Sequence, residues 1–261
     1  MSDVTCFSTL FMVRYGLKHA MSSSFPELSV TQVAGVEIRV EPWSWPFATA
    51  QRQEIDAYFT DLKRRRAALW NGRVLMLNSY SVSNGVFTGT AFETDYANLC
   101  AWRDWAFPDQ TVFNFFAPAA IQTCDGAYVL GEMAPYTAGA GKITFPSGTP
   151  EPGDIIDGSV DLMGNMRREV AEETGLTLDE LECEVGWSVV RDRSSLVLVK
   201  RFSSSQLGDE LLARIKSYLE NETQPEFSDV RIVRSPATFH PRMEPFTLAF
   251  LDYETRHGLS A

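Results

Sequence analysis

The chain has 261 residues, enough to bury a sizeable core in one or two domains. Hydrophobic residues make up 44% of it and charged residues 22%, which is the composition of a soluble globular protein. The net charge of -11 argues against a nucleic-acid surface, which would need a basic patch, and no stretch reaches the ~18 apolar residues of a membrane span. We therefore expect neither nucleic acid nor a membrane as a partner.

The cysteines are widely spaced and form no C-x-x-C motif: Cys6, Cys100, Cys124 and Cys183. This pattern favours free thiols in a reducing compartment over a disulfide framework or a zinc site, so we expect a cytoplasmic protein. The N-terminus shows no convincing secretory signal. Residues 1–20 are either part of the native protein or a leader before a true start at Met21.

The first half of the chain is expected to form a smaller α+β domain over residues 1–110. Its predicted elements follow from apolar alternation and helical spacing, and are a strand, a helix, two strands and a helix at 33–40, 48–70, 73–77, 86–93 and 96–105. Asn84-Gly85 is a hairpin signal between the two paired strands. The dense basic run Lys63 to Arg66 is interpreted as a solvated helix face. We recognise no catalytic constellation in this half.

The second half, residues 111–261, is expected to form a mixed α/β sheet with helices on both faces. Strands are predicted at 113–123, 127–132, 142–145, 183–191, 196–202 and 230–233, and helices at the stretch around 168–174, at 206–219 and at 244–254. The continuous apolar run from Leu196 to Val199 is typical of a strand that is buried on both faces.

Three glutamates gather on one helix face in the stretch R-E-V-A-E-E-T-G-L. At about 100° per residue, Glu172 and Glu173 lie on either side of Glu169. Like charges at this spacing repel each other, and no lysine on the same turn relieves them. Carboxylates alone make an oxygen site that suits Mg²⁺ or Mn²⁺. Gly175 is expected to end the helix.

This stretch resembles the second half of the Nudix box, G-x5-E-x7-R-E-U-x-E-E-x-G-U, where U is a bulky aliphatic residue. Upstream, P-S-G-T-P-E-P-G-D resembles the first half, with Gly148 and Asp154 in the places of the glycine and the first glutamate. This sequence departs from the family pattern twice. Aspartate replaces the first glutamate, and thirteen residues, in place of seven, separate it from Arg168, which indicates a six-residue insertion within residues 155–167.

The resemblance implies the α/β/α sandwich of Nudix proteins and hydrolysis of a nucleoside diphosphate linked to another group. By position, Glu172 and Glu173 match metal ligands, Glu169 matches a ligand or general base, and Arg168 matches the residue that orients it. Gly148 and Gly153 would let the loop backbone approach the metal site, where Asp154 would help electrostatically.

Several further residues are candidates for the site. Many Nudix proteins recruit another acid from a later loop, for which Glu222, Glu226 and Asp229 are available, although each also fits a solvated surface position. Arg191 fits a phosphate-binding role and an ordinary surface charge equally well. Oligomerisation is common among Nudix relatives, but nothing in this sequence marks an interface.

The substrate is suggested by a weaker resemblance that spans most of the chain. An N-terminal half before the box, W-N-G-R at Trp70 to Arg73 and the enlarged box together resemble the Nudix branch that cleaves UDP-glucose to UMP and glucose 1-phosphate. Two alternatives remain, a hydrolase of ADP-ribose or a dinucleotide and a nucleotide-binding module without turnover. The retained glutamates favour an enzyme. A scaffold protein that uses the helix as an acidic docking face would show no stabilisation by metal.

Overall fold

A computed structural model describes residues 28–66 and 69–257, and its larger sheet is mixed, as predicted. Its strands are β1 (Ser29–Val33), β5 (Asn114–Phe116), β6 (Ala119–Gln122), β7 (Tyr128–Met133), β8 (Ile143–Thr144), β11 (Glu182–Cys183), β12 (Trp187–Asp192), β13 (Ser195–Ser203) and β14 (Phe227–Val233). The central order is β1-β12-β13-β6-β7-β14. β13 runs parallel to β5 and β6, and the other pairs in this sheet are antiparallel.

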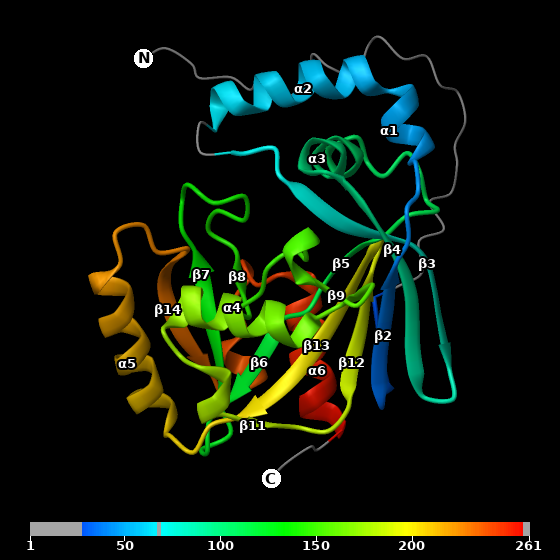
Figure 1. Ribbon diagram of the computed structural model, residues 1–261. Coiled ribbons are helices and arrows are strands. Elements are labelled where there is room, and N and C mark those ends of the chain that lie inside the picture. Colours follow the sequence, from blue (N-terminus) through cyan, green and yellow to red (C-terminus); the bar gives the residue numbers. More distant parts are fainter. Residues whose placement is uncertain (1–27, 67–68, 258–261) are drawn as a thin grey trace, which may run out of the picture.

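Helices cover both faces of this sheet (Figure 1). α4 (Leu162–Thr174) and α5 (Gly208–Asn221) share one hydrophobic cluster with Leu196 and Leu198 of β13. The alternate residues Val197 and Val199 point to the opposite face and join the cluster of α6 (Pro245–His257). Because successive side chains of a strand alternate between faces, the apolar run of β13 serves two cores at once. The α/β/α sandwich expected from the sequence is therefore confirmed.

The N-terminal half contributes three strands to a second sheet, which has five strands in all, and also forms three helices. Its elements are α1 (Pro46–Ala50), α2 (Arg52–Arg65), α3 (Tyr96–Asp104), β2 (Gly35–Val40), β3 (Arg73–Ser83) and β4 (Val86–Asp95). One face carries a cluster that includes Met76 and Trp102. The other face contributes Leu75 and Phe87 to the same cluster as α4 and α5. The two halves of the chain thus share buried apolar surface.

Two strand pairings cross the expected division at residue 110, which stays a prediction. β1, from the first half, pairs with β12 in the larger sheet. In the other direction, the short hairpin of β9 (Ile155–Ile156) and β10 (Ser159–Val160) from the second half extends the N-terminal sheet, whose order is β3-β4-β2-β10-β9. Asp157 and Gly158 form its turn with φ angles of 50° and 76°. This hairpin contains the residues of the expected insertion.

Four predicted elements are divided or shortened in the structure. The strand expected at 183–191 is interrupted at residues 184–186, between β11 and β12. The strand expected at 33–40 is split at Ala34 between β1 and β2, which belong to different sheets. Proline at 118 has no N–H to donate and separates β5 from β6 within the expected strand 113–123. The helix expected at 48–70 is interrupted at Gln51 and ends at Arg65. Residues 67–68 of that prediction lie outside the described part of the chain.

Three of the four cysteines lie within the described residues. Cys100 is a buried free thiol, and Cys124 and Cys183 are exposed free thiols. Cys6 and the leader question at residues 1–20 fall outside the described residues. Among the helices within 28–66 and 69–257, none combines the length and the apolar character of a membrane span.

Candidate functional site

α4 holds the predicted acidic face in a helix with defined ends. It begins after Asp161, whose Oδ1 accepts a hydrogen bond from the Gly164 N–H at 2.9 Å. It ends at Gly175, which has a left-handed φ of 68°, as expected for a helix stop. Met166 and Val170 are fully buried on the inner side. The helix is thereby fixed against the sheet, and the glutamates occupy its remaining face.

The loop before α4 is held by backbone hydrogen bonds from both halves of the chain. The Ala119 N–H of β6 donates to the Pro146 carbonyl at 2.9 Å, and the Leu75 N–H of β3 donates to the Pro150 carbonyl at 2.9 Å. Between these anchors lie Ser147 and Gly148, which contact the glutamates of α4. The N-terminal sheet therefore helps to position the candidate site.

Glu173 is the most deeply buried of the three glutamates, with 1% of its surface exposed. Its Oε2 accepts a hydrogen bond from the Ser147 N–H at 2.8 Å. Burial raises the pKa of Glu173 well above its ordinary value; this hydrogen bond opposes the rise, and the neighbouring carboxylates of Glu226, Glu169 and Glu172 add to it. A cation beside this group would favour its ionised form.

Glu169 lies directly against the loop at Gly148. A Cβ atom placed on Gly148 would be 2.1 Å from Cδ of Glu169, so no other residue fits there without displacing the carboxylate. Arg168 Nη2 donates to Glu169 Oε1 at 2.9 Å. Burial raises the pKa of Glu169 to about 7; Arg168 opposes the rise, and the charge of Glu172 adds to it. Close approach of the loop is thus real at Gly148.

Gly153 does not share this close approach. A Cβ atom there would meet only Glu151 Oε1, at the ordinary contact distance of 3.5 Å. The expectation that Gly153 lets the backbone approach the metal site therefore has no counterpart in the contacts of this loop. Its neighbour Asp154 closes a short 3-10 turn, η1 (Pro152–Asp154), by accepting a hydrogen bond from the Glu151 N–H at 3.0 Å.

Asp154 connects this turn to α4. It is 5% exposed, and its Oδ1 accepts from Arg168 Nη1 at 2.7 Å. Its Oδ2 accepts from Asn165 Nδ2 at 2.9 Å. Arg168 therefore bridges two carboxylates, Asp154 on one side and Glu169 on the other. No local pattern singles out Asn165, because only the folded turn brings it to Asp154.

Of the three later acids, Glu226 is the one whose charge interacts with the glutamates of α4. Partial desolvation, and then the charge of Glu172, raises its pKa, and its carbonyl accepts from the Ala134 N–H at 2.8 Å. Asp229 instead forms an ion pair with Lys216 at 3.0 Å. Glu222 lies on the exposed surface near Tyr218, whose hydroxyl donates to the Glu172 carbonyl at 3.1 Å.

Arg191 is engaged elsewhere among the described residues. Its Nη1 donates to the Tyr80 hydroxyl at 2.7 Å, and its guanidinium lies 5.8 Å from the ring centres of both Tyr80 and Phe113. No hydrogen bond or ion pair joins Arg191 to the glutamates of α4 within the described part of the chain. A phosphate-binding role for Arg191 stays a prediction.

The four carboxylates of this cluster fit a hard divalent cation in their chemistry: Glu169, Glu172, Glu173 and Glu226. All of their donors are oxygens. The pKa values of Glu169, Glu173 and Glu226 are raised, first by burial and then by neighbouring carboxylates, and a cation would favour the ionised forms. Within residues 28–66 and 69–257, no three acidic, histidine or cysteine side chains already form a metal-binding group.

A cavity of about 270 Å³ opens beside Ser147. Its walls include the rings of Phe116 and Phe246, which meet edge to face at 5.3 Å, and the ion pair between Lys142 and Glu244 at 3.2 Å. The cavity therefore offers apolar and charged surface next to the residue that holds Glu173. Its volume suits a single ring system, such as a base or a sugar.

Comparisons with known proteins give similarity in structure only. No protein-family model and no curated protein matches the sequence. Among solved structures, the chain is similar to the Nudix hydrolase RenU from M. smegmatis (13% identity, 57% of this chain and 91% of that chain, TM-score 0.39). It is also similar to the MutT protein from Methanosarcina mazei Go1 (17% identity, 57% and 96%, TM-score 0.38).

A third similar structure is a bifunctional NMN adenylyltransferase/ADP ribose pyrophosphatase from Francisella tularensis, solved with AMP and a manganese ion (14% identity, 61% of this chain and 45% of that chain, TM-score 0.40).

Proposed function

We propose that this chain is a divalent-metal-dependent Nudix-type hydrolase that cleaves the diphosphate of a nucleoside-diphosphate sugar, with UDP-glucose as the preferred type of substrate. The observation that supports an enzyme most directly is the set of contacts around α4. Glu173 is buried against the Ser147 N–H, Glu169 is pressed against Gly148, and Arg168 holds Glu169 from the side. A purely structural helix would have no need for two desolvated carboxylates at one loop.

In the proposed reaction, the oxygen of water bonds to one phosphorus of the diphosphate, and the bond from that phosphorus to the bridging oxygen breaks. UDP-glucose would give UMP and glucose 1-phosphate, with release of protons. Bound Mg²⁺ or Mn²⁺ would neutralise the diphosphate and lower the pKa of the attacking water. Glu172 and Glu173 would hold the metal, together with Glu169 if it is not the general base.

The remaining residues of the cluster would act by positioning. Arg168 would keep Glu169 oriented, because its other end is fixed to the buried Asp154 at 2.7 Å. The Ser147 N–H would keep Glu173 directed at the loop. Glu226 is proposed as the additional acid from the later loop. The cavity beside Ser147 would receive the sugar or the base, since its volume of about 270 Å³ is too small for the whole nucleotide sugar.

The test is product analysis over a small panel: UDP-glucose, UDP-galactose, GDP-mannose, ADP-ribose and NADH, each with Mg²⁺ and with EDTA. We expect EDTA-sensitive release of UMP and a sugar 1-phosphate, identified by mass. Release of AMP from ADP-ribose or NADH in preference to UMP would reassign the substrate. If no compound is hydrolysed while a nucleotide still raises the melting temperature, the chain is a binding module and the enzyme proposal is wrong.

A further inference from the structure

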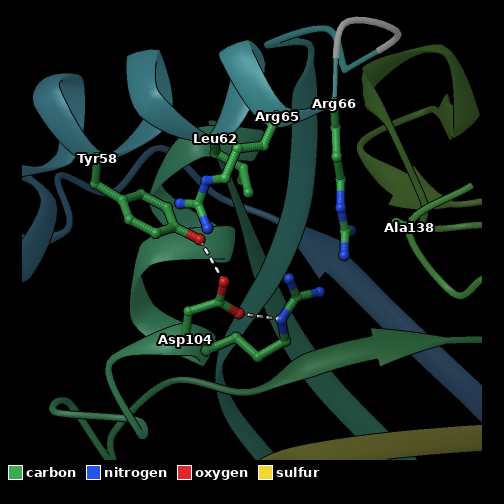
Figure 2. A pocket seen from close by; sticks show the side chains of 7 residues that line it. Tyr58, Leu62, Arg65, Arg66, Asp104 and Ala138 are labelled. Atoms are coloured by element: carbon green, nitrogen blue, oxygen red, sulfur yellow. Dashed lines mark hydrogen bonds and ion pairs between the residues drawn. The ribbon is translucent and has the colours of Figure 1, made fainter. Parts of the chain in front are cut away.

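A second cavity lies away from the glutamates, between two helices of the N-terminal half and the loop that joins β7 to β8. Its volume is about 500 Å³. The residues that line it are Tyr58, Leu62 and Arg65 from α2, Arg66 directly after α2, Arg103 and Asp104 from the end of α3, and Ala138 from the loop. Figure 2 shows Arg65 and Arg66 extending from α2 toward the side where Asp104 lies.

Three arginines and one carboxylate give this cavity an excess of positive charge. Arg103 donates through Nε to Asp104 Oδ1 at 2.9 Å, and Arg65 donates through Nη2 to Asp61 at 2.7 Å. Each guanidinium has five N–H groups, so most of the donors remain available. Arg66 makes no ion pair with any residue in the ranges 28–66 and 69–257.

The carboxylate of the cavity cannot serve all of these donors. Asp104 already accepts hydrogen bonds from the Tyr58 hydroxyl and from Arg103 Nε. Figure 2 shows the hydrogen bond between Tyr58 and Asp104. Burial raises the pKa of the Cys100 thiol, and Arg103 and Arg66 both oppose that rise. Guanidinium groups from two different helices therefore act on the same region of α3, where their like charges repel each other.

Helix stabilisation accounts for only part of this basic cluster. Basic residues in the last turn of a helix interact favourably with its C-terminal dipole, which is a sufficient reason for Lys63 and Arg64 of α2. The same interaction accounts for Arg65 of α2 and Arg103 of α3, which also lie in the last turns of their helices, but it does not account for Arg66, which follows α2. In a chain with a net charge of -11, this cavity has the opposite sign to the whole molecule.

We propose that this cavity binds a phosphoryl group, either as inorganic phosphate or as the phosphate of a small phosphomonoester. Arg66 and the terminal nitrogens of Arg103 would donate to the phosphate oxygens, because planar guanidinium groups match phosphate geometry in a bidentate manner. Tyr58 and Leu62 would face the remainder of a phosphomonoester. The site is separate from the glutamates of α4 and does not depend on the proposed hydrolysis.

The loop gives this site a defined place relative to the other cavity. Ala138 lines the arginine cavity, and the next residue, Gly139, lines the cavity beside Ser147. The same loop begins at Ala134, whose N–H donates to the Glu226 carbonyl at 2.8 Å. A bound phosphoryl group would thus contact the segment that separates the two cavities.

The experiment is calorimetric titration of the full chain in EDTA with inorganic phosphate and, separately, with glucose 1-phosphate, at constant ionic strength. The variants are Arg66→Gln and Arg103→Gln, and the matched control is Arg64→Gln, which changes the charge of the same helix without touching the cavity. We expect either cavity variant to weaken binding by about tenfold, since a hydrogen bond to a charged group contributes roughly that factor. The Arg64→Gln variant should bind like the wild type.

The two ligands separate the two sources of the phosphoryl group. Tighter binding of glucose 1-phosphate identifies a phosphomonoester site, and equal binding identifies a site for phosphate itself. Equal affinity of the Arg66→Gln and Arg64→Gln variants would overturn the proposal, as would a chloride titration that reproduces the phosphate signal. Arg66 is exposed, and the Arg66→Lys variant, which keeps the charge but not the bidentate geometry, gives a second test with little risk to folding.

Discussion

The contact between Gly148 and Glu169 allows a test of the candidate site by adding one methyl group at residue 148. In Gly148→Ala, the added Cβ would stand 2.1 Å from Glu169 Cδ, whereas real Cβ contacts essentially never fall below 3.0 Å. The carboxylate would therefore have to withdraw by about 1 Å. Overpacking of this kind costs about 1–3 kcal/mol in stability, and a 1 Å displacement of a catalytic group costs about 100-fold in rate.

The assay compares Mg²⁺-dependent turnover and thermal unfolding of Gly148→Ala with those of Gly153→Ala. The second variant adds the same methyl group to the same loop, but its nearest new neighbour is Glu151 Oε1 at 3.5 Å. We expect Gly148→Ala to lose about 100-fold in turnover and a few degrees in melting temperature, and Gly153→Ala to change little. If Gly148→Ala retained wild-type turnover, the position of Glu169 against the loop would have no bearing on activity.

Three further changes test separate parts of the reasoning. Glu173→Gln should abolish most metal-dependent turnover while the melting temperature changes by no more than about 2 °C, because the amide oxygen still accepts the Ser147 N–H; unchanged turnover would contradict the ligand role. Deletion of residues 155–160 should still give a folded protein and alter the relative rates over the nucleotide-sugar panel; an unchanged profile would mean that the hairpin is only a tolerated loop. Hydrogen bonding to Arg242 is the chief reason that the pKa of Glu132 lies below its ordinary value of 4.5. The ionised Glu132 side chain therefore stabilises the folded state above pH 4.5, and this stabilisation is lost as the pH falls below 4.5 toward the folded-state pKa. Urea unfolding between pH 6 and pH 3 should therefore show a larger loss of unfolding free energy in the wild type than in Glu132→Gln, and equal losses would exclude this contribution.

Turns and buried strands were predicted correctly where a short sequence pattern determines them. Asn84-Gly85 has positive φ angles of 51° and 73° and joins β3 to β4, as the hairpin signal predicted. The run from Leu196 to Val199 is buried on both faces, as its continuous apolar character predicted. Which sheet a strand joins was not readable from local pattern. The alternation of residues 33–40 is continuous in sequence, yet the chain crosses from one sheet to the other at Ala34.

The helix face of the site was predictable because it depends on spacing alone, whereas its partners depend on tertiary contacts. Glu169, Glu172 and Glu173 follow from 3.6 residues per turn. The Ser147 N–H that holds Glu173 comes from a loop 26 residues earlier and carries no signal of its own in the sequence. Glu226 was only one of three candidate acids in the sequence, because its charge interaction with Glu172 depends on the tertiary fold.

The hairpin of β9 and β10 explains how an enlarged box can keep its two halves in contact. The Asp161 N–H donates to the Asp154 carbonyl at 2.8 Å, so the six residues between them leave and return at nearly the same point. Removing those six residues from the thirteen between Asp154 and Arg168 leaves the seven of the common pattern. The hairpin of β9 and β10 is hydrogen-bonded to the N-terminal sheet, since the Val40 N–H of β2 donates to the Gly158 carbonyl at 2.9 Å. The insertion therefore attaches the N-terminal half to the turn that contains Asp154. Asp154 in turn accepts a hydrogen bond from Arg168, which also donates to Glu169.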